Sequence, residues 1–499
     1  MQISSLIGGL SAIGGLSLAQ ATVTSPVIEA DDFSIPGALQ DLGVDVSQIP
    51  ALKSFAAIET RSTDKACAAA CASLSFLFGS KVSDQETTGY NNFTSSFWSV
   101  QQEEVQPHCV FRPTKNTEVS TAVLLSRLTG CEFAARSGGH AAFTGASSAP
   151  GGISIWFKDM SAVTLNPDKT VASIEPGNNW LTTYAALEPY GLAVIGGRAS
   201  SIGVGGFVLG GGISYHSNLY GWSCDNVESF EVVAASGLIV TASANSYPDL
   251  YWALRGGGNN FGLVTKYNMY TIPSPKMYGG ARTFLETEFP QVINAWINVI
   301  NNATVDGNAQ QYVAFLQTQG MNLASAELTY VKNDPNPEIF KQYRNISAIS
   351  DNSSAKTLVE YVKYLETENP YGLREVYWPI SAALDEKFAN WVVNLFYSMI
   401  PDVANVAGVQ PNESDDKTVY AFVNKFMEKV IAEAKSVGVF NEYVYMNYAS
   451  IFQDAVAGYG AANKAQLKKI AKKYDPREVY QTLQPGYFKL DGPPVTPSF

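Results

Sequence analysis

Short apolar runs begin at Cys109 and predict a series of β-strands with a helix between the first two. Apolar residues from Val119 to Leu128 lie on one face of that helix, and Gly130 is expected to end it. Asn116 or Thr117 is expected to cap its first turn. The strands predicted here are Cys109–Arg112, Phe133–Arg136, Ile153–Phe157 and Val171–Glu175.

The same kind of pattern continues toward the end of the chain. A helix is predicted over Trp180–Leu187. Ser236-Gly237 is expected to turn a hairpin between Val227–Ala234 and Leu238–Ala242. A last helix is predicted over Lys464–Lys473. Short strands mixed with helices favour an α+β fold over a regular series of parallel βαβ units.

A chain of 499 residues exceeds what one hydrophobic core usually supports, so two domains are expected. Between about Pro273 and Phe440 the glycine density falls while long helices and aromatic residues increase, which indicates a second domain. The formal net charge is −12. Such a surface repels phosphate backbones and anionic lipids, so nucleic-acid and membrane partners are disfavoured, although the charge says nothing about the substrate. Separately, we expect a monomer that acts on a small molecule.

The N-terminus predicts export from the cell. A short apolar run from Leu6 to Leu18 is followed by Ala19-Gln-Ala21, which is typical of a secretory signal cut after Ala21. A buried N-terminal helix is the alternative, and no basic residue precedes the run. Acceptor sequences for N-glycosylation also favour a secreted protein; they occur at Asn92, Asn302, Asn345, Asn352 and Asn412.

Four of the five cysteines precede the glycine-rich region: Cys67, Cys71, Cys109 and Cys131. In an oxidising compartment they can form two disulfides with three alternative pairings. Cys67 and Cys71 are spaced one helical turn apart, so each can reach a different partner. Buried free thiols are the alternative, and a zinc site is disfavoured because the spacing around His108 fits no common zinc pattern. Cys224 is expected to be a buried thiol.

The first segment that carries chemistry is Arg136-Ser-Gly-Gly-His140, at the end of a predicted strand. Two adjacent glycines allow the backbone to approach an anion closely and to point N–H groups at it. The pyrophosphate of a dinucleotide is such an anion. His140 is one of only three histidines in the chain. A turn that contains a hydrogen-bonded histidine is the alternative interpretation.

The second segment runs from Gly196 to Gly212. Its many glycines indicate either close contact of the backbone with a flat or phosphorylated ligand, or very tight packing. It is not a P-loop, because no Gly-Lys-Ser/Thr follows, and Val208 occupies the place of the last glycine of a GxGxxG motif. Asp225 lies at a distance suited to ribose recognition, so a nicotinamide-binding Rossmann fold is an alternative.

A third glycine turn, Arg255–Gly262, leads into another strand. Each segment is weak evidence alone, but their order along the chain is specific. In this order, the three segments make the chain resemble the vanillyl-alcohol-oxidase superfamily of flavoproteins. The resemblance is closest to the fungal FAD-linked oxidases of the berberine-bridge-enzyme-like group, which includes oligosaccharide oxidases. Further matching motifs are Trp222-Ser-Cys-Asp-Asn-Val227, Tyr445-Met-Asn-Tyr448, Tyr459-Gly460 and Tyr474-Asp-Pro476.

This resemblance implies an α+β fold with a two-part PCMH-type FAD-binding domain and an α+β substrate domain, in which helices pack on an antiparallel sheet. The expected limits are a signal peptide at 1–21, the N-terminal part of the FAD domain at 22–104, the PCMH-type FAD-binding core at 105–275, the substrate-binding domain at 276–440 and a C-terminal segment returning to the FAD domain at 441–499.

The resemblance also implies that His140 holds FAD covalently through the flavin 8α-methyl group, which raises the reduction potential and prevents loss of the cofactor. Some relatives form a second link through a cysteine, but that position aligns with Ala199, which has no thiol. We therefore predict a single covalent link. The expected FAD-binding residues are Arg136, Ser137, Gly138, Gly139, His140, Ser200, Ser201, Gly203, Gly205, Gly206, Gly210, Gly212, Asp225, Gly262, Val264 and Asn447.

Two tail residues correspond to the motif that lies over the flavin in relatives. Asn447 can hydrogen-bond a flavin carbonyl or ring nitrogen. Tyr448 is the predicted base or proton relay on the substrate side, although a phenol needs a charged or hydrogen-bonding neighbour to act near neutrality. An aromatic wall without a proton role is the alternative.

Relatives usually supply a carboxylate or other polar partner from a sheet of the substrate domain, but this chain passes from Gly408 to Asp415 without the strands expected there. The resemblance implies a secreted oxidase that transfers hydride from a small organic substrate (a sugar, an alcohol or a specialised metabolite) to FAD and then reduces O2 to H2O2. A flavin-binding protein without turnover is the alternative, and the missing strands after Gly408 favour it.

Overall fold

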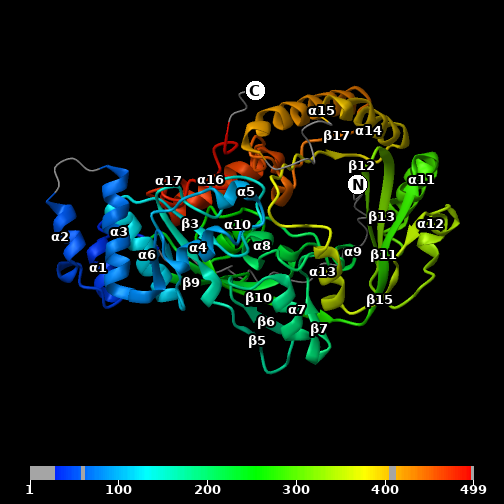
Figure 1. Cartoon of the computed structure of the whole chain (residues 1–499). Coiled ribbons are helices and arrows are strands. Elements are labelled where there is room, and N and C mark those ends of the chain that lie inside the picture. The colour runs from blue at the N-terminus through cyan, green and yellow to red at the C-terminus, as the bar shows by residue number, and fades with distance from the viewer. Residues whose placement is uncertain (1–27, 58–61, 404–411, 496–499) are drawn as a thin grey trace, which may run out of the picture.

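The computed structural model describes residues 28–57, 62–403 and 412–495. The predicted signal peptide and Gly408 lie outside these ranges. Figure 1 shows two lobes side by side, the first built from the N-terminal half of the chain and the second from the strands and helices that follow. Helices and sheets are mixed, and the second lobe contains an antiparallel sheet, so the predicted α+β class is confirmed. The exact domain limits stay a prediction.

The first lobe contains two sheets. A four-stranded sheet has the order β1-β2-β4-β3, with parallel pairs β2–β4 and β3–β4; its strands are β1 (Val82–Asp84), β2 (Cys109–Phe111), β3 (Phe133–Arg136) and β4 (Ile153–Trp156). A six-stranded antiparallel sheet is centred on the long strand β10 (Leu263–Pro273), and its other strands are β5 (Val163–Leu165), β6 (Val171–Ile174), β7 (Leu192–Val194), β8 (Val227–Val233) and β9 (Ile239–Ser243). The predicted hairpin is the β8–β9 pair.

Helices cover both sheets of this lobe and include two that return from the far end of the chain (Figure 1). The peptide N–H of Phe133 on β3 donates to the carbonyl of Leu483, which joins the tail to the first sheet. The helices are α1 (Ile35–Asp41), α2 (Pro50–Ala56), α3 (Thr63–Phe78), α4 (Thr88–Thr94), α5 (Val100–Glu103), α6 (Asn116–Thr129), α7 (Trp180–Leu187), α8 (Val204–Leu209), α9 (Ser217–Tyr220), α10 (Pro248–Leu254), α16 (Ala461–Tyr474) and α17 (Val479–Thr482).

The second lobe is built on a five-stranded antiparallel sheet, and different helices pack on its two faces. Alternate residues of its strands face opposite ways. Val313 and Phe315 pack into the core beneath the helices, whereas Tyr312 and Ala314 face the first lobe. The elements are β11 (Met277–Leu285), β12 (Ala309–Thr318), β13 (Met321–Tyr330), β14 (Ser350–Asp351), β15 (Ser354–Lys356), α11 (Phe289–Asn302), α12 (Lys341–Asn345), α13 (Leu358–Glu366), α14 (Glu386–Met399) and α15 (Asp416–Ser436), with a small sheet of β16 (Ser381–Ala382) and β17 (Phe440–Asn441).

Two disulfides join the helical layer to the first sheet. Cys67 and Cys71 lie one turn apart on α3 and reach different partners, Cys131 and Cys109 respectively. This arrangement selects one of the three pairings that the sequence leaves open. Cys224 is free and buried, as predicted.

One predicted helix cap is wrong. Helix α6 begins at Asn116, and its N-cap residue is Lys115, with no side-chain cap hydrogen bond. The Asn116 amide instead donates to Glu231 on β8, and Glu118 accepts the Thr114 peptide N–H at 2.9 Å. The Asn116 side chain therefore bonds to the neighbouring strand instead of capping the helix, as its local propensity had predicted. Gly130 ends the helix in the left-handed conformation, as expected.

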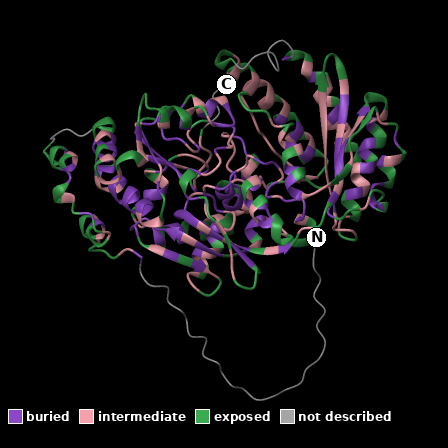
Figure 2. Cartoon of the chain, turned by 60° about the horizontal axis from the view of Figure 1, so that its bottom comes forward, coloured by how far each residue is buried: buried purple, intermediate pink, exposed green. Residues whose placement is uncertain are grey.

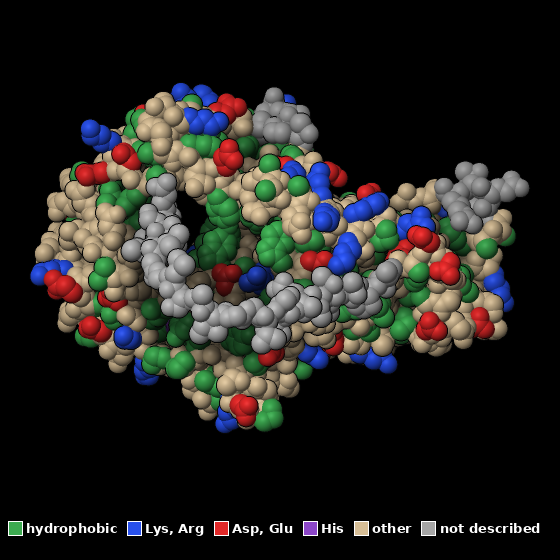
Figure 3. Space-filling model, turned by 180° about the vertical axis from the view of Figure 1, so that it is seen from behind, with side chains coloured by type: hydrophobic (Ala, Val, Ile, Leu, Met, Phe, Trp, Pro, Cys, Tyr) green, Lys and Arg blue, Asp and Glu red, His purple; other side chains and the backbone are tan. Residues whose placement is uncertain are grey.

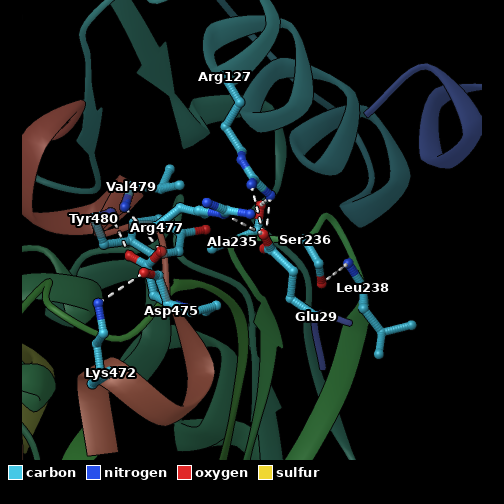
Figure 4. Close-up of polar contacts among 11 residues, drawn as sticks. Glu29, Arg127, Ala235, Ser236, Leu238, Lys472, Asp475, Arg477, Val479 and Tyr480 are labelled. Atoms are coloured by element: carbon cyan, nitrogen blue, oxygen red, sulfur yellow. Dashed lines mark hydrogen bonds and ion pairs between the residues drawn. The ribbon is translucent and has the colours of Figure 1, made fainter. Parts of the chain in front are cut away.

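A buried ion pair fixes the start of the described chain to the first lobe (Figure 4). Arg127 on α6 donates to both carboxylate oxygens of Glu29, at 2.9 and 3.0 Å, and to the carbonyl of Ala235. Beside it, Asp475 accepts the peptide N–H groups of Val479 and Tyr480 and so holds the first turn of α17. The tail motif Tyr474-Asp-Pro476 therefore has a structural role.

Buried residues fill the interior of the first lobe, while exposed residues occupy its outer helices and turns (Figure 2). The largest apolar core lies around the six-stranded sheet and extends to helices of both the middle and the tail of the chain. Within the described residues, no helix is both long and apolar enough to cross a membrane.

Candidate active site

A cavity of about 760 Å³ lies between the two lobes. Its walls come from the glycine segments of the first lobe, from β12 and the segment 377–379 of the second, and from the tail segment 445–449. From behind, a hollow is visible with hydrophobic side chains at its walls and charged side chains within it (Figure 3). Eleven predicted site residues line the cavity: Ser137, Gly138, Gly139, His140, Gly203, Gly205, Gly206, Gly262, Val264, Asn447 and Tyr448.

Two glycine turns that are far apart in sequence form a cradle on the first lobe. A Cβ atom added to Gly138 would lie 2.3 Å from the Gly203 nitrogen, and one added to Gly203 would lie 2.1 Å from the Gly138 nitrogen. Ser137 joins the turns, since its hydroxyl accepts from the Gly205 N–H at 3.0 Å and donates to the carbonyl of Pro176. Only residues without a side chain allow this approach, which leaves backbone exposed to a ligand.

His140 presents a neutral imidazole to the cavity. Its Nε2 atom is buried and has no hydrogen-bond partner among the described residues. Burial lowers the pKa of His140 to about 4, so the ring carries no charge near neutrality. The indole of Trp98 stacks on the imidazole with ring centroids 4.1 Å apart and planes 12° apart. An uncharged, unpartnered ring nitrogen beside a glycine cradle fits a histidine that bonds to a cofactor held there.

Tyr448 has a cationic partner. The Arg198 guanidinium donates to the Tyr448 hydroxyl at 2.7 Å and lies 5.7 Å from the centre of the Tyr312 ring. Burial by itself lowers the pKa of Arg198, but the surrounding tyrosines, Tyr448 foremost, hold it above its ordinary value. A fixed cation at the phenolic oxygen stabilises negative charge on that oxygen, which a proton acceptor requires.

Asn447 is held in place by three protein groups. Its amide N–H groups donate to the carbonyl of Phe207 at 2.9 Å and to the Tyr445 hydroxyl at 3.0 Å, and its carbonyl accepts from Tyr487 at 3.2 Å. A Cβ atom on Gly210 would lie 2.0 Å from the Asn447 carbonyl oxygen. These contacts fix the tail to the cradle, and Asn447 also lines the cavity, so its binding to the flavin stays a prediction.

Six predicted site residues do not line the cavity formed by the described residues: Arg136, Ser200, Ser201, Gly210, Gly212 and Asp225. The Arg136 guanidinium donates to the carbonyl of Phe93 at 2.8 Å and lies 3.7 Å from the centre of the Phe97 ring, so it supports the turn before His140 from behind. Asp225 accepts the Trp222 N–H at 3.0 Å and forms an ion pair with Arg255 at 3.9 Å. Neither side chain reaches the cavity.

The other four pack close to the cradle. The Ser201 N–H donates to Glu366 on α13, and the Ser200 carbonyl accepts from Leu181 on α7. Gly210 leaves room for Asn447, and a Cβ atom on Gly212 would collide with Phe207 and Ser223. Tight packing, one of the interpretations left open for the glycine-rich segment, therefore accounts for these positions.

The sequence interpretation missed several residues of the cavity wall. Arg198 carried a recognisable signal, because it is the only charged residue between Gly196 and Gly212. No local signal marked the aromatic residues of the second lobe, because they come from separate elements: Tyr312, Tyr377 and Trp378. At the position of the second attachment in some relatives, Ala199 lines the cavity, whereas Cys224 does not line it.

The fold and the cavity define a flavoprotein, and comparisons with known proteins agree. The family model described as "FAD binding domain" matches residues 107–243. The FAD-dependent monooxygenase tpcD of Cochliobolus heterostrophus is 30% identical over 474 residues, which cover 83% of this chain and 92% of that protein. The chain therefore belongs to the FAD-dependent oxidoreductases that share this FAD binding domain.

Solved structures share the fold at lower sequence identity. Glucooligosaccharide oxidase from Acremonium strictum, described with a 6-S-cysteinyl, 8α-N1-histidyl FAD, has a TM-score of 0.64 and 19% identity, and the match covers 87% of this chain and all of that one (100%). Berberine bridge enzyme, solved as a single-residue variant in complex with (S)-reticuline, has a TM-score of 0.66 and 17% identity, covering 82% of this chain and 96% of that one. Both similarities establish the fold alone.

Proposed function

We propose that this protein is a secreted oxidase that holds FAD through one covalent bond to His140 and oxidises a small organic substrate with O2. One observation carries the proposal: a single cavity joins the glycine cradle, the unpartnered imidazole of His140 and the Arg198–Tyr448 pair. The first two features suit a bound dinucleotide, and the third suits proton removal from a substrate. Ala199 offers no thiol for a second bond.

Each wall of the cavity has a part in this reaction. The cradle and His140 would hold FAD, which accepts two electrons from a substrate and passes them to O2 to give H2O2. Tyr448 takes the proton from the substrate's hydroxyl or similar group, and Arg198 stabilises the phenolic oxygen while it is negatively charged. Tyr312, Tyr377 and Trp378 supply a largely aromatic wall against which the substrate lies.

Turnover is tested with purified protein and a panel of alcohols, oligosaccharides and aromatic metabolites, with release of H2O2 as the measurement. We expect at least one compound to bleach the flavin in the absence of air. Tyr448→Phe should lower kcat by about 10²–10⁴-fold while the FAD content stays the same. A yellow protein that no compound reduces would favour the alternative of a flavin-binding protein without turnover.

Covalent attachment is tested by acid precipitation. We expect wild-type protein to carry its yellow colour into the pellet and His140→Ala to release it into the supernatant. His108→Ala is the matched control, because His108 lies outside the cavity lining and is partly exposed. A colourless wild-type pellet would overturn the covalent link while leaving FAD binding intact.

A monooxygenase is a second candidate, favoured by the printed name of the curated relative. The two reactions differ in the fate of O2: an oxidase returns both oxygen atoms as H2O2, whereas a monooxygenase places one atom in the product. Turnover under ¹⁸O2 followed by mass spectrometry of the product separates them. We expect unlabelled product and one H2O2 for each substrate oxidised.

Export and a monomeric state complete the proposal. The two disulfides fit an oxidising compartment. Recovery of a processed chain that begins after Ala21 from the culture medium, with a monomer mass by light scattering, would support both statements.

A further inference from the structure

The segment from Trp98 to Gln102 holds the backbone on both sides of His140. The Gln102 side-chain amide donates to the carbonyls of Gly139 and Ala141, at 3.1 and 2.7 Å. The Ser99 hydroxyl also donates to the Ala141 carbonyl, at 2.8 Å, and the Trp98 N–H donates to that of Gly139 at 3.5 Å. Because the carbonyls before and after His140 are both bound, the position of its Cα atom is fixed.

The ring of Trp98 fixes the imidazole plane. Trp98 is buried and does not line the cavity formed by the described residues, so its indole backs the imidazole of His140. The indole is itself immobilised, because its Nε1 donates to the carbonyl of Asn369 at 3.3 Å and its ring lies nearly parallel to Tyr377, with centroids 5.8 Å apart. Rotation of the imidazole would break a flat stack at 4.1 Å.

The same segment is bonded to the second lobe. The Val100 N–H donates to the carbonyl of Leu373, the Gly372 N–H donates to the carbonyl of Trp98, and the Gln101 amide donates to the carbonyl of Glu375. The orientation of His140 thus depends on a segment that joins the cofactor side of the cavity to the segment 369–375.

We propose that Trp98 is a positioning residue for covalent attachment of FAD: it holds the His140 imidazole in the plane and position from which a ring nitrogen reaches the flavin 8α-carbon. This inference rests on the proposed covalent link. The attachment replaces one C–H bond of the 8α-methyl group and the imidazole N–H bond with a C–N bond. The two hydrogens and two electrons released reduce O2 to H2O2.

The physical reason is orientation. A neutral imidazole on an unrestrained side chain samples several rotamers, and only one directs a nitrogen at the reacting carbon. Restricting the ring to that geometry raises the rate without touching the reacting atoms, and small misplacements lower rates strongly. Trp98 therefore affects how fast the bond forms, more than how tightly FAD binds.

The test compares Trp98→Phe with Trp98→Leu. Both keep an apolar side chain in the core, but only Phe retains a flat ring against His140. Each variant is purified and loaded to full occupancy with FAD, and the covalent fraction is read from the acid-precipitated pellet over time. We expect Trp98→Phe to form the bond at nearly the wild-type rate and Trp98→Leu to form it about tenfold or more slowly. Total FAD content and thermal midpoint are measured in parallel.

Trp391→Leu is the matched control. Trp391 lies on α14, outside the lining of the cavity formed by the described residues, and its ring lies beside Phe388 with centroids 6.3 Å apart. Its covalent fraction should match the wild type. Equal rates in Trp98→Leu and the wild type, or equal losses in Trp98→Leu and Trp391→Leu, would overturn the inference while the covalent link stands. A wild-type pellet without flavin would overturn the link and the inference together.

Discussion

On the cofactor side of the cavity, the close contacts run between backbones. The Gly138 and Gly203 turns approach to distances that exclude any side chain, and Ser137 bonds to the backbone at two points. On the substrate side the contacts run between side chains: Arg198 to Tyr448 and Tyr377 to Tyr448. The comparison teaches that the cofactor-binding side of the cavity is formed mainly by backbone, whereas the substrate-binding side is formed by side chains that substitution can change.

The largest effect is expected from adding one methyl group to the cradle. Gly203→Ala places a Cβ atom 2.1 Å from the Gly138 nitrogen, and neither backbone can move without separating the turns. We expect the free energy of unfolding to fall by about 1–3 kcal/mol and FAD to be lost. The measurements are the urea midpoint and the absorbance of bound flavin.

Gly206→Ala is the matched control for that change. Gly206 lies nearby on α8 and needs no left-handed backbone; apart from its own helix, no atom of the described residues lies within 4 Å of an added Cβ. Its unfolding midpoint should equal or exceed that of the wild type, because alanine favours a helix. Equal losses in both variants would contradict the backbone-contact account of the cradle.

A smaller effect is expected at the segment that carries Tyr377 and Trp378. Arg374 bonds to both carboxylate oxygens of Asp416, at 2.7 and 2.5 Å, and to Glu104 at 2.5 Å. The hydrogen bonds that Arg374 donates to Asp416 hold the pKa of the guanidinium above its ordinary value. Because the partners are partly exposed, we expect Arg374→Met to cost about 1–2 kcal/mol of unfolding free energy. The substrate KM should rise while FAD content stays constant.

The surface pair of Lys425 and Asp402, 3.7 Å apart with both side chains 60% exposed, provides the control for Arg374. Lys425→Met should change the urea midpoint by less than about 1 kcal/mol. If Arg374→Met lost FAD before it changed KM, the separation between the two sides of the cavity would be wrong.

The smallest effect concerns pH and a carboxylate of the substrate lobe. Burial raises the pKa of Glu327 to about 7. Hydrogen bonds from Tyr361 and Tyr364, at 2.6 and 3.1 Å, lower this pKa. Of the nearby charges, Lys356 lowers the pKa of Glu327 and Glu368 raises it. The folded protein keeps a proton here that the unfolded chain releases near its ordinary pKa of 4.5. This contribution to stability is present at low pH and is lost as pH rises through about 7.

Glu327→Gln stays neutral at every pH. Its free energy of unfolding should therefore decrease less than that of the wild type between about pH 5 and about pH 8, as measured by urea titration. Parallel pH profiles of the two proteins would indicate that Glu327 is charged in the folded state.

Glu327 also shows why the substrate side escaped prediction. The expected carboxylate of the substrate sheet was sought near Gly408. Glu327 is a buried carboxylate on β13, directly opposite Tyr312 of β12 in the antiparallel pair, but the carboxylate that lines the cavity is Glu368, shortly after α13. The place of Glu327 depends on the register of two strands and on α13, which supplies Tyr361 and Tyr364. Nothing in the residues around position 327 indicates those partners.

The sequence by itself determined the strands around His140, the β8–β9 hairpin and the glycine turns of the cradle, because each depends on residues that are close together in the chain. Tertiary structure alone decided the disulfide pairing, the pairing of Arg198 with Tyr448, the displacement of Asp225 from the cavity and the stacking of Trp98 on His140. The physical reason is the distance along the sequence between the residues that interact. A glycine turn follows from local backbone freedom, whereas Arg198 and Tyr448 are 250 residues apart and meet only when both lobes and the tail have folded.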